Sequence, residues 1–496
     1  MGRRADSLTK ALAGAFFFTA IGAGAFFTGC KEDDAGQKTL SREELLDPST
    51  CGKCHVDHYK QWSGSMHAYA AEDPLFLAMN ARFQQQTGGT QGTFCVKCHA
   101  PMAVQDGLTK DGLNLPQLPA KYKGVTCYFC HTTESVGELH NNGLKAGEPT
   151  TMRGGFPNAV KNEAHRSMYS DLHDGTKLPS ATACGSCHDI VTPKGAHIEK
   201  TFVEWKGSLF ATEKGLSCNT CHMKAEDGTR PVANVPGVFG RAFHSHTFAA
   251  VDRALVPFPN QEEQKVEVQA FLDASIQASL CVGRRNGKAT LRVVLDNVFA
   301  GHSFPSGATA DRRAWVELVA KAGGQVIYKS GAVEDGKAVL EGPDDPDLWL
   351  LRSLTFDEAK QPIHDFGLAK CDEARMLPFP VTADPTDPRF YQRNIVREFP
   401  KDGTLIALPE TVSMRVRMIP VGYDVLDDLI ANAGLDPTLR AKMEIMQVGP
   451  TITWMPGVAE PFSEPGTGDL YECVTSTQQN FKANKYPPTP INTCSP

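Results

Sequence analysis

The sequence lacks several features that mark common classes of protein. Its 50 Lys and Arg residues are outnumbered by 57 Asp and Glu residues, for a net charge of −7. This charge argues against nucleic-acid binding, which needs a basic face. No Cys-x-x-Cys-Lys motif occurs, and the C-terminal half shows no nucleophilic triad, phosphate-binding loop or zinc site. The one long apolar run, Ala11 to Phe27, is shorter than a membrane span.

This apolar run and its flanks are typical of an export signal. Three basic residues precede it, which predicts a signal peptide over residues 1–29. Phe27-Thr28-Gly29-Cys30 resembles a bacterial lipoprotein box and predicts acylation of Cys30, while Ala23-Gly24-Ala25 offers an ordinary cleavage site as the alternative. We expect an exported protein, periplasmic or at the cell surface, anchored to the outer membrane by lipid. Residues 30–49, polar and rich in charge, would form the tether.

Cysteine is abundant, and most of it follows one pattern. Two thiols two residues apart can each form a thioether to a porphyrin vinyl group, and the following His is then directed at the iron. Structural zinc sites use paired Cys-x-x-Cys units with no His after each, and a thioredoxin-like pair would occur once. The pattern therefore predicts five covalently bound c-type haems. The Cys-x-x-Cys-His motifs are Cys51-Cys54-His55, Cys95-Cys98-His99, Cys127-Cys130-His131, Cys184-Cys187-His188 and Cys218-Cys221-His222.

The spacing of the motifs predicts the organisation of the N-terminal half. Roughly 200 residues, 50–250, would wrap five porphyrins, at about 40 residues each. So little chain cannot bury a conventional core, and the haems themselves must form it. We expect an α+β protein with a haem-cored, mostly α-helical or irregular N-terminal domain. Close packing of the haems would suit electron transfer.

Ten further histidines could supply the sixth ligands of the irons, and most of them precede residue 250. His/His ligation lacks the potential-raising effect of a Met ligand, so we expect low potentials. His67 is the first candidate, because it follows Tyr59, Trp62 and Ser65 at helical spacing. A related frame recurs from Phe202 with Phe in place of His. The aromatic residues are therefore expected to pack, while His67 has a separate task.

The run from Cys51 to Ala68 resembles the hydroxylamine oxidoreductase / tetrahaem cytochrome c (c554-like) superfamily. So does Gly124-Val125-x-Cys127-x-x-Cys130-His131, which is followed by His140. A third similarity is Glu204-Trp205-x-x-Ser208, which leads into the fifth motif. The resemblance covers about residues 50–250. It implies that His67 and His140 are distal ligands, although His140 lies nine residues past His131, further than the family's spacing.

The resemblance also implies a ligand at His165, which precedes the fourth motif, and one in His244-Ser245-His246. Residues two apart in a strand point to opposite faces, so we favour His246, with His244 as the substitute. For the fifth iron we nominate His302, within a Gly-His-Ser-Phe-Pro-Ser-Gly loop similar to one in multihaem cytochromes with a C-terminal β-domain. A plain Gly/Pro turn is the alternative. His58 is expected at solvent or at a propionate. Three other histidines are expected at the surface: His173, His197 and His364.

The C-terminal half, residues 265–496, is predicted to be β-sandwich-like. Val412 to Met418 alternates apolar and polar residues, as a half-buried strand does. Gly323-Gly324 offers a hairpin turn. Tyr423 to Met446 reads as a helical piece interrupted at Gly434. In an oxidising compartment the four remaining cysteines are expected to form two disulfides, with three possible pairings: Cys281, Cys371, Cys473 and Cys494.

Together these patterns predict an electron carrier whose partners are redox proteins, either other cytochromes or a quinol-linked reductase, with a lipid-anchored membrane association and no nucleic acid. The alternative is a multihaem oxidoreductase acting on a small nitrogen or sulfur compound at one five-coordinate haem. That alternative gains weight if His302 is not a ligand. A third class, subunits stacked into a conductive filament, fits poorly with an anchor and a C-terminal domain.

Overall fold

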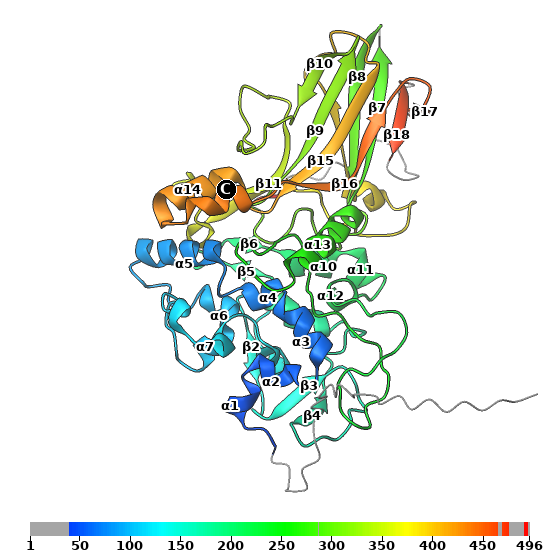
Figure 1. Ribbon diagram of the computed structural model, residues 1–496. Helices are drawn as coiled ribbons and strands as arrows, with labels where there is room; N and C mark the ends of the chain where they lie inside the picture. The colour runs from blue at the N-terminus through cyan, green and yellow to red at the C-terminus, as the bar shows by residue number, and fades with distance from the viewer. Residues whose placement is uncertain (1–38, 286, 465–468, 476–490, 495–496) are drawn as a thin grey trace, which may run out of the picture. The chain divides into compact units, whose positions relative to one another are not determined.

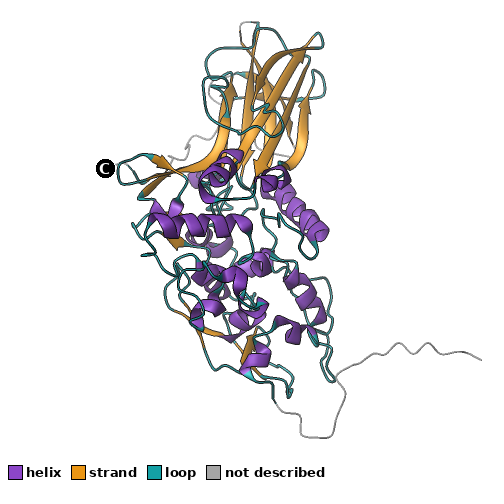
Figure 2. Ribbon diagram, turned by 60° about the vertical axis from the view of Figure 1, so that its left-hand side comes forward, coloured by secondary structure: helices purple, strands orange, loops and turns teal. Residues whose placement is uncertain are grey.

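The computed structural model describes residues 39–285, 287–464, 469–475 and 491–494. The predicted signal peptide and Cys30 lie outside these residues. Helices dominate the N-terminal part, and strands gather in the C-terminal part (Figures 1 and 2). The expected α+β class is thus confirmed. Residues 37–496 form one compact unit. Within the described residues, no helix is both long and apolar enough to span a membrane.

The N-terminal part is built from short helices. Only α5 exceeds eight residues before the β-rich part, and it begins with Asp73 as N-cap and Pro74 at its first position. The largest separate apolar clusters here hold six and five buried residues, so the chain buries little core of its own. The helices are α1 (Arg42–Leu45), α2 (Pro48–Gly52), α3 (Val56–Ser63), α4 (Met66–Tyr69), α5 (Pro74–Gln86), α6 (Val96–His99), α7 (Pro101–Gln105), α8 (Cys127–Thr132), α9 (Ser180–Gly185), α10 (Thr201–Gly207), α11 (Leu209–Thr212) and α12 (Cys218–His222).

Three small two-stranded sheets connect these helices. The β1/β2 and β5/β6 pairs are antiparallel, and β3/β4 is parallel. Two short 3-10 helices, η1 (Leu115–Gln117) and η2 (Ala120–Tyr122), precede the third motif. The strands are β1 (Thr133–Val136), β2 (Leu144–Ala146), β3 (Thr151–Gly154), β4 (Arg166–Tyr169), β5 (Ile190–Val191) and β6 (His197–Glu199).

Part of the predicted tether is folded, which corrects the expectation for residues 39–49. Ser41 forms a capping box with Glu44 at the start of α1. Leu45 and Leu46 are buried against a cluster that includes Tyr128. These two leucines hold the segment against the N-terminal part, although its many charged residues suggested an unfolded tether.

The C-terminal part contains two sheets packed face to face. In the described residues, the first has the order β16-β15-β9-β11-β13-β19, with β10 added on β9 and β12 on β11, and the second has the order β14-β8-β7-β18-β17. Their strands are β7 (Gln277–Arg285), β8 (Lys288–Asp296), β9 (Arg313–Ala322), β10 (Gln325–Ser330), β11 (Trp349–Phe356), β12 (Pro362–Ile363), β13 (Cys371–Arg375), β14 (Asn394–Phe399), β15 (Thr411–Ile419), β16 (Met446–Trp454), β17 (Glu460–Ser463), β18 (Leu470–Thr475) and β19 (Ile491–Asn492).

The core of this sandwich explains the sequence pattern. Side chains of β7 and β8 meet those of β9, β11 and β15, with Val416 and Trp349 among the buried residues. Burial alternates along β15, as expected. The Gly323-Gly324 turn joins β9 to β10. The remaining helices are α13 (Gln261–Ser275), α14 (Tyr423–Ala433), η3 (Phe366–Leu368), η4 (Pro388–Arg393) and η5 (Pro437–Lys442).

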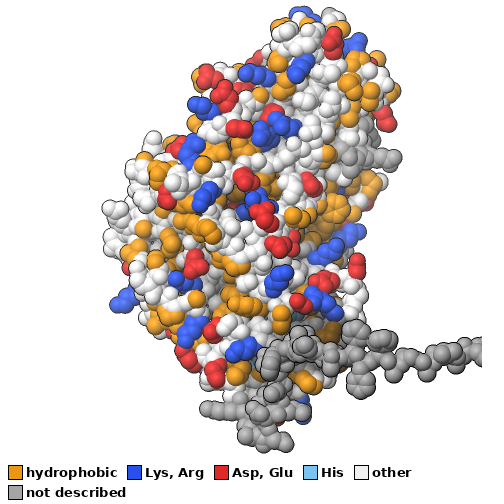
Figure 3. Space-filling model, in the orientation of Figure 1, with side chains coloured by type: hydrophobic (Ala, Val, Ile, Leu, Met, Phe, Trp, Pro, Cys, Tyr) orange, Lys and Arg blue, Asp and Glu red, His pale blue; other side chains and the backbone are white. Residues whose placement is uncertain are grey.

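The end of α14 and the disulfides also agree with the sequence. Gly434 adopts a left-handed conformation as the C-cap of α14, with φ of 69°. Of the three pairings left open, the structure has Cys281–Cys473 and Cys371–Cys494. On the face shown in Figure 3, acidic and basic side chains are interspersed.

Candidate functional site

Each Cys-x-x-Cys-His motif lies on or beside a single helical turn. The third and fifth motifs lie within α8 and α12, and the others begin or end a short helix. The ten motif cysteines form no disulfide, and the two disulfides use four cysteines outside the motifs. A helical turn brings both thiols and the following imidazole to one side, as haem attachment requires.

Four of the five motif histidines donate Nδ1–H to a backbone carbonyl. A carbonyl oxygen can only accept, so this bond fixes the tautomer and leaves the Nε2 lone pair available. Histidines that ligate metals usually have such an outer partner. The Nδ1–O distances are 2.8 Å for His55 to Val232, 2.9 Å for His99 to Ala70, 2.5 Å for His131 to Arg153 and 3.0 Å for His222 to Ala249.

Three motif histidines lie near a histidine from a distant segment at the separation of two axial ligands. The ring of His58 is also 6.2 Å from that of His55, but His58 lies only three residues beyond that ligand and cannot reach the far side of its iron. Two imidazoles that ligate one iron through bonds of about 2 Å have ring centroids about 6.2 Å apart, once each ring's half-width is included. The observed centroid separations are 6.4 Å for His55 with His165, 6.1 Å for His67 with His188 and 6.4 Å for His131 with His246. The residues present therefore fit axial ligation of haem iron.

The protonation of these histidines fits the same role. Burial lowers the pKa of His67 to about 3 and that of His246 to about 4. Both imidazoles are consequently neutral at pH 7, which is the form that binds a metal. His246 also donates Nδ1–H to the carbonyl of His244 at 2.9 Å.

His302 approaches the fifth motif from the C-terminal half. Its Nδ1 donates to the Ser303 carbonyl at 2.9 Å. Burial, and to a smaller extent the nearby His222 and His188, lower its pKa to about 4. Glu204, on α10, accepts a hydrogen bond from the backbone N–H of Ser303 at 3.1 Å. The loop that carries His302 is thus fastened to the helix that precedes the fifth motif.

Residues 50–132, which contain the first three motifs, match the family described as cytochrome c554 and c-prime. Among solved structures, the chain is similar to a penta-heme cytochrome c552 from Thermochromatium tepidum, with 20% identity and a TM-score of 0.55 over 84% of this chain and 98% of that one. The chain is therefore similar to multihaem c-type cytochromes in its first three motifs and in its fold. No curated protein matches it.

The motifs lie beside one another in space. The side chain of Cys51 is next to that of Cys127, and the side chain of Cys184 is next to that of Cys218. Cys98 of the second motif is likewise next to Cys187 of the fourth. The attachment points are therefore neighbours in space, although the motifs are spread over more than 160 residues of sequence.

His99 and His140 do not form a ring pair of the kind described above. The ring that stacks on His99 is Phe76, with centroids 3.8 Å apart, and no histidine ring faces His99 at the separation of the other pairs in the described chain. Next to His140, Asn142 contacts the second and fourth motifs through the carbonyls of Lys97 and Ser186. The buried Nδ1 of His140 has no hydrogen-bond partner. His140 thus lies near these motifs, and no iron is assigned to it.

The other histidines have different partners. His58 was expected at solvent or a propionate, but its ring stacks on Phe243 at 4.1 Å and meets His246 edge-on at 4.5 Å. Phe243 thus covers one side of this half-buried ring. His173 uses Nε2 to donate to the Cys130 carbonyl at 2.8 Å. His244 uses Nδ1 to donate to the carbonyl of Met223, beside the fifth motif.

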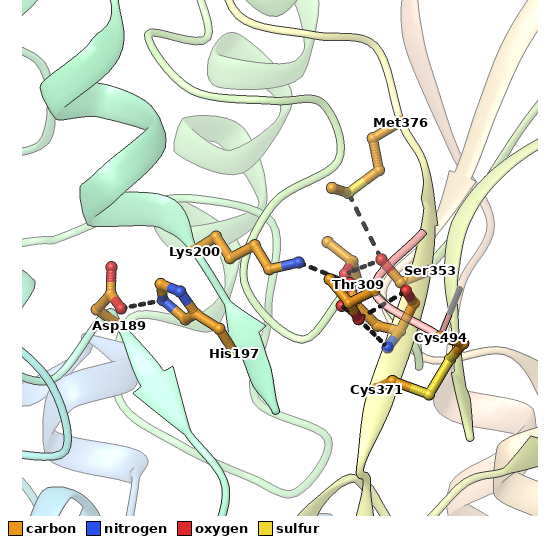
Figure 4. A network of polar contacts seen from close by, with 10 residues as sticks. Asp189, His197, Lys200, Thr309, Ser353, Cys371, Met376 and Cys494 are labelled. Carbon is orange, nitrogen blue, oxygen red and sulfur yellow. Dashed lines mark hydrogen bonds and ion pairs between the residues drawn. A yellow bond between two sulfur atoms is a disulfide. The ribbon is translucent and has the colours of Figure 1, made fainter. Parts of the chain in front are cut away.

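A polar network joins β6 and α10 to the sandwich (Figure 4). Lys200 pairs with the buried carboxylate of Asp372 at 2.7 Å, next to the Cys371–Cys494 disulfide. His197, expected at the surface, hydrogen-bonds Asp189. Lys200, Glu204 and Asp372 line one small pocket. The contact between Lys200 and Asp372 gave no sequence signal, because these residues are 172 positions apart.

Proposed function

We propose that this protein binds five c-type haems and carries electrons between redox partners at a bacterial membrane or cell surface. The proposal rests on three pairs of histidine rings, because the two rings of each pair are as far apart as the two axial ligands of one iron. Haem, when bound, supplies one-electron redox chemistry. The ten motif cysteines would hold the haems by thioether bonds, and the five motif histidines would be the proximal ligands.

Four distal ligands follow from the ring pairs and from the docked loop. His165 would serve the iron held by His55, and His67 the iron held by His188. His246 would serve the iron of the third motif, and His302 that of the fifth. The Nδ1–H bonds to carbonyls hold several of these rings in the ligating tautomer. An all-histidine ligand set supports low potentials, because it lacks a Met ligand.

The iron of the second motif separates the carrier from the alternative function. If His140 ligates it, and if His302 ligates the iron of the fifth motif, where His222 also stacks on a phenylalanine, every iron is six-coordinate and the protein is a carrier. If it stays five-coordinate, it could bind a small nitrogen or sulfur compound, as an oxidoreductase requires. The stacking of Phe76 on His99, with no facing histidine in the described residues, supports keeping this alternative.

Two measurements on the matured, oxidised protein test the proposal. Intact mass should show five covalent haems, and fewer would refute the count. Electron paramagnetic resonance should show only low-spin iron for a carrier. A high-spin fraction near one in five would favour the enzyme, and His140→Ala would then leave that fraction unchanged.

The partners and location belong to the same proposal. We expect the redox partners to be other cytochromes or a quinol-linked reductase. The charged N-terminal sequence and Cys30 support export and lipid anchoring at the outer membrane. On the face in Figure 3 the acidic and basic side chains are mixed, so a redox partner that docks there would not be recognised by a patch of one charge.

A further inference from the structure

Two tryptophans make the same hydrogen bond to the chain that enters a haem motif. The indole N–H of Trp62 donates to the carbonyl of Val125 at 2.8 Å, two residues before Cys127. The indole N–H of Trp205 donates to the carbonyl of Leu216 at 3.0 Å, two residues before Cys218. Each tryptophan follows one motif and fastens another. Trp62 connects the first motif to the third, and Trp205 the fourth to the fifth.

The motifs connected in this way are also the ones whose first cysteines are neighbours. The side chain of Cys51 lies next to that of Cys127, and the side chain of Cys184 lies next to that of Cys218. The contact joins the same cysteine of each motif in both cases. The two pairs are therefore built alike, although the tryptophan and the motif that it fastens are separated by a long segment in the first pair and a short one in the second.

A glycine and an aromatic ring complete the shared arrangement. A Cβ on Gly52 would lie 2.7 Å from Cγ of Tyr59, and a Cβ on Gly185 would lie 2.2 Å from Cδ2 of Phe202. Both glycines directly follow the first cysteine of a motif, and both rings lie three residues before the tryptophan. The close approach fixes the helix of each tryptophan against its own motif.

We propose that Trp62 and Trp205 are positioning residues that set the separation of two equivalent haem pairs. This inference rests on the proposed function, since it assumes haem at all five motifs. The contact between the glycine and the ring three residues before the tryptophan holds the tryptophan's helix against one motif. The indole N–H then holds the chain that enters the other motif of the pair. In a close-packed interior, losing such a donor leaves a carbonyl without its partner and lets the entering chain shift. At the position five residues after the tryptophan the two pairs differ: His67 can ligate an iron, and Phe210 cannot.

The test uses Trp62→Phe, Trp205→Phe and the double variant in the full, matured protein. Phenylalanine keeps an aromatic ring and removes the N–H. Trp315→Phe is the matched control, because Trp315 donates to the Gly331 carbonyl at 3.0 Å and packs with α14 on the outer face of β9, in a cluster that contains no motif residue. Circular dichroism in the Soret region reports the coupling between neighbouring porphyrins, and peptide mass spectrometry reports which motifs carry haem.

We expect each single variant to lose part of the Soret couplet and the double variant to lose the sum of both parts, since the two sites are separate. Trp315→Phe should keep the full couplet. Loss of haem confined to the motif that the indole fastens would also support positioning. Five haems with an unchanged couplet would overturn the inference, and so would haem loss spread evenly over all motifs. Fewer than five haems in the unaltered protein would instead refute the proposed function.

Discussion

His67→Ala is the sharpest test of the ligand pairing. The His67 ring lies 6.1 Å from that of His188, which leaves room for one iron and its two bonds. Alanine cannot reach that iron, so the haem at the fourth motif should change from low-spin to high-spin. With five haems present, the high-spin fraction of the oxidised protein should rise by about one fifth of the total iron.

Electron paramagnetic resonance and the high-spin charge-transfer absorption would measure this fraction. Added imidazole should enter the space left by the side chain and restore the low-spin signal. His173→Ala is the matched control: its ring lies 5.5 Å from His131, but its Nε2 is engaged by the Cys130 carbonyl. His173→Ala should not change the spin state. An unchanged spectrum in His67→Ala would refute the pairing, and an equal response in the control would refute the use of ring separations.

Three further changes have defined outcomes. Burial raises the pKa of Glu204 to about 7 from its ordinary 4.5, so the folded state binds more protons and stability falls as pH rises between these values; Glu204→Gln should flatten that fall in the Tm. Replacing Cys281 and Cys473 together opens a bridge across 192 residues and should cost up to about 5 kcal/mol in chemical denaturation. Cys30→Ser should release the protein into the soluble fraction, and continued membrane association would count against lipidation.

The local part of the structure was predictable because it depends on short stretches of sequence. The alternation from Val412 to Met418 specifies a strand with one buried face. Gly434 ends α14 because glycine adopts the left-handed conformation without strain. The haem motifs are equally local, since both thiols and the proximal imidazole come from one helical turn.

The partners of these local pieces were not predictable from one sequence. His55 and His165 are 110 residues apart, and Cys281 and Cys473 are 192 apart. No periodicity links residues at such separations, so the sequence supplied the candidates without the pairing. Leu45 and Leu46 were missed for the related reason that their apolar partner, Tyr128, lies far along the chain.

The long separations have a consequence for how the protein acquires its structure. His67 follows the first motif and faces the fourth, and His246 follows the fifth and faces the third. Four of the motifs therefore have a candidate distal ligand from a distant segment, and the second motif has none assigned. Since the N-terminal half buries only small apolar clusters of its own, such ligands would join segments that side-chain packing alone holds weakly. Failure to attach one haem should then loosen segments far from the affected motif, and limited proteolysis of a Cys218→Ala variant should cut near His302 as well as near the fifth motif. Cleavage confined to the altered motif would show that the segments fold independently.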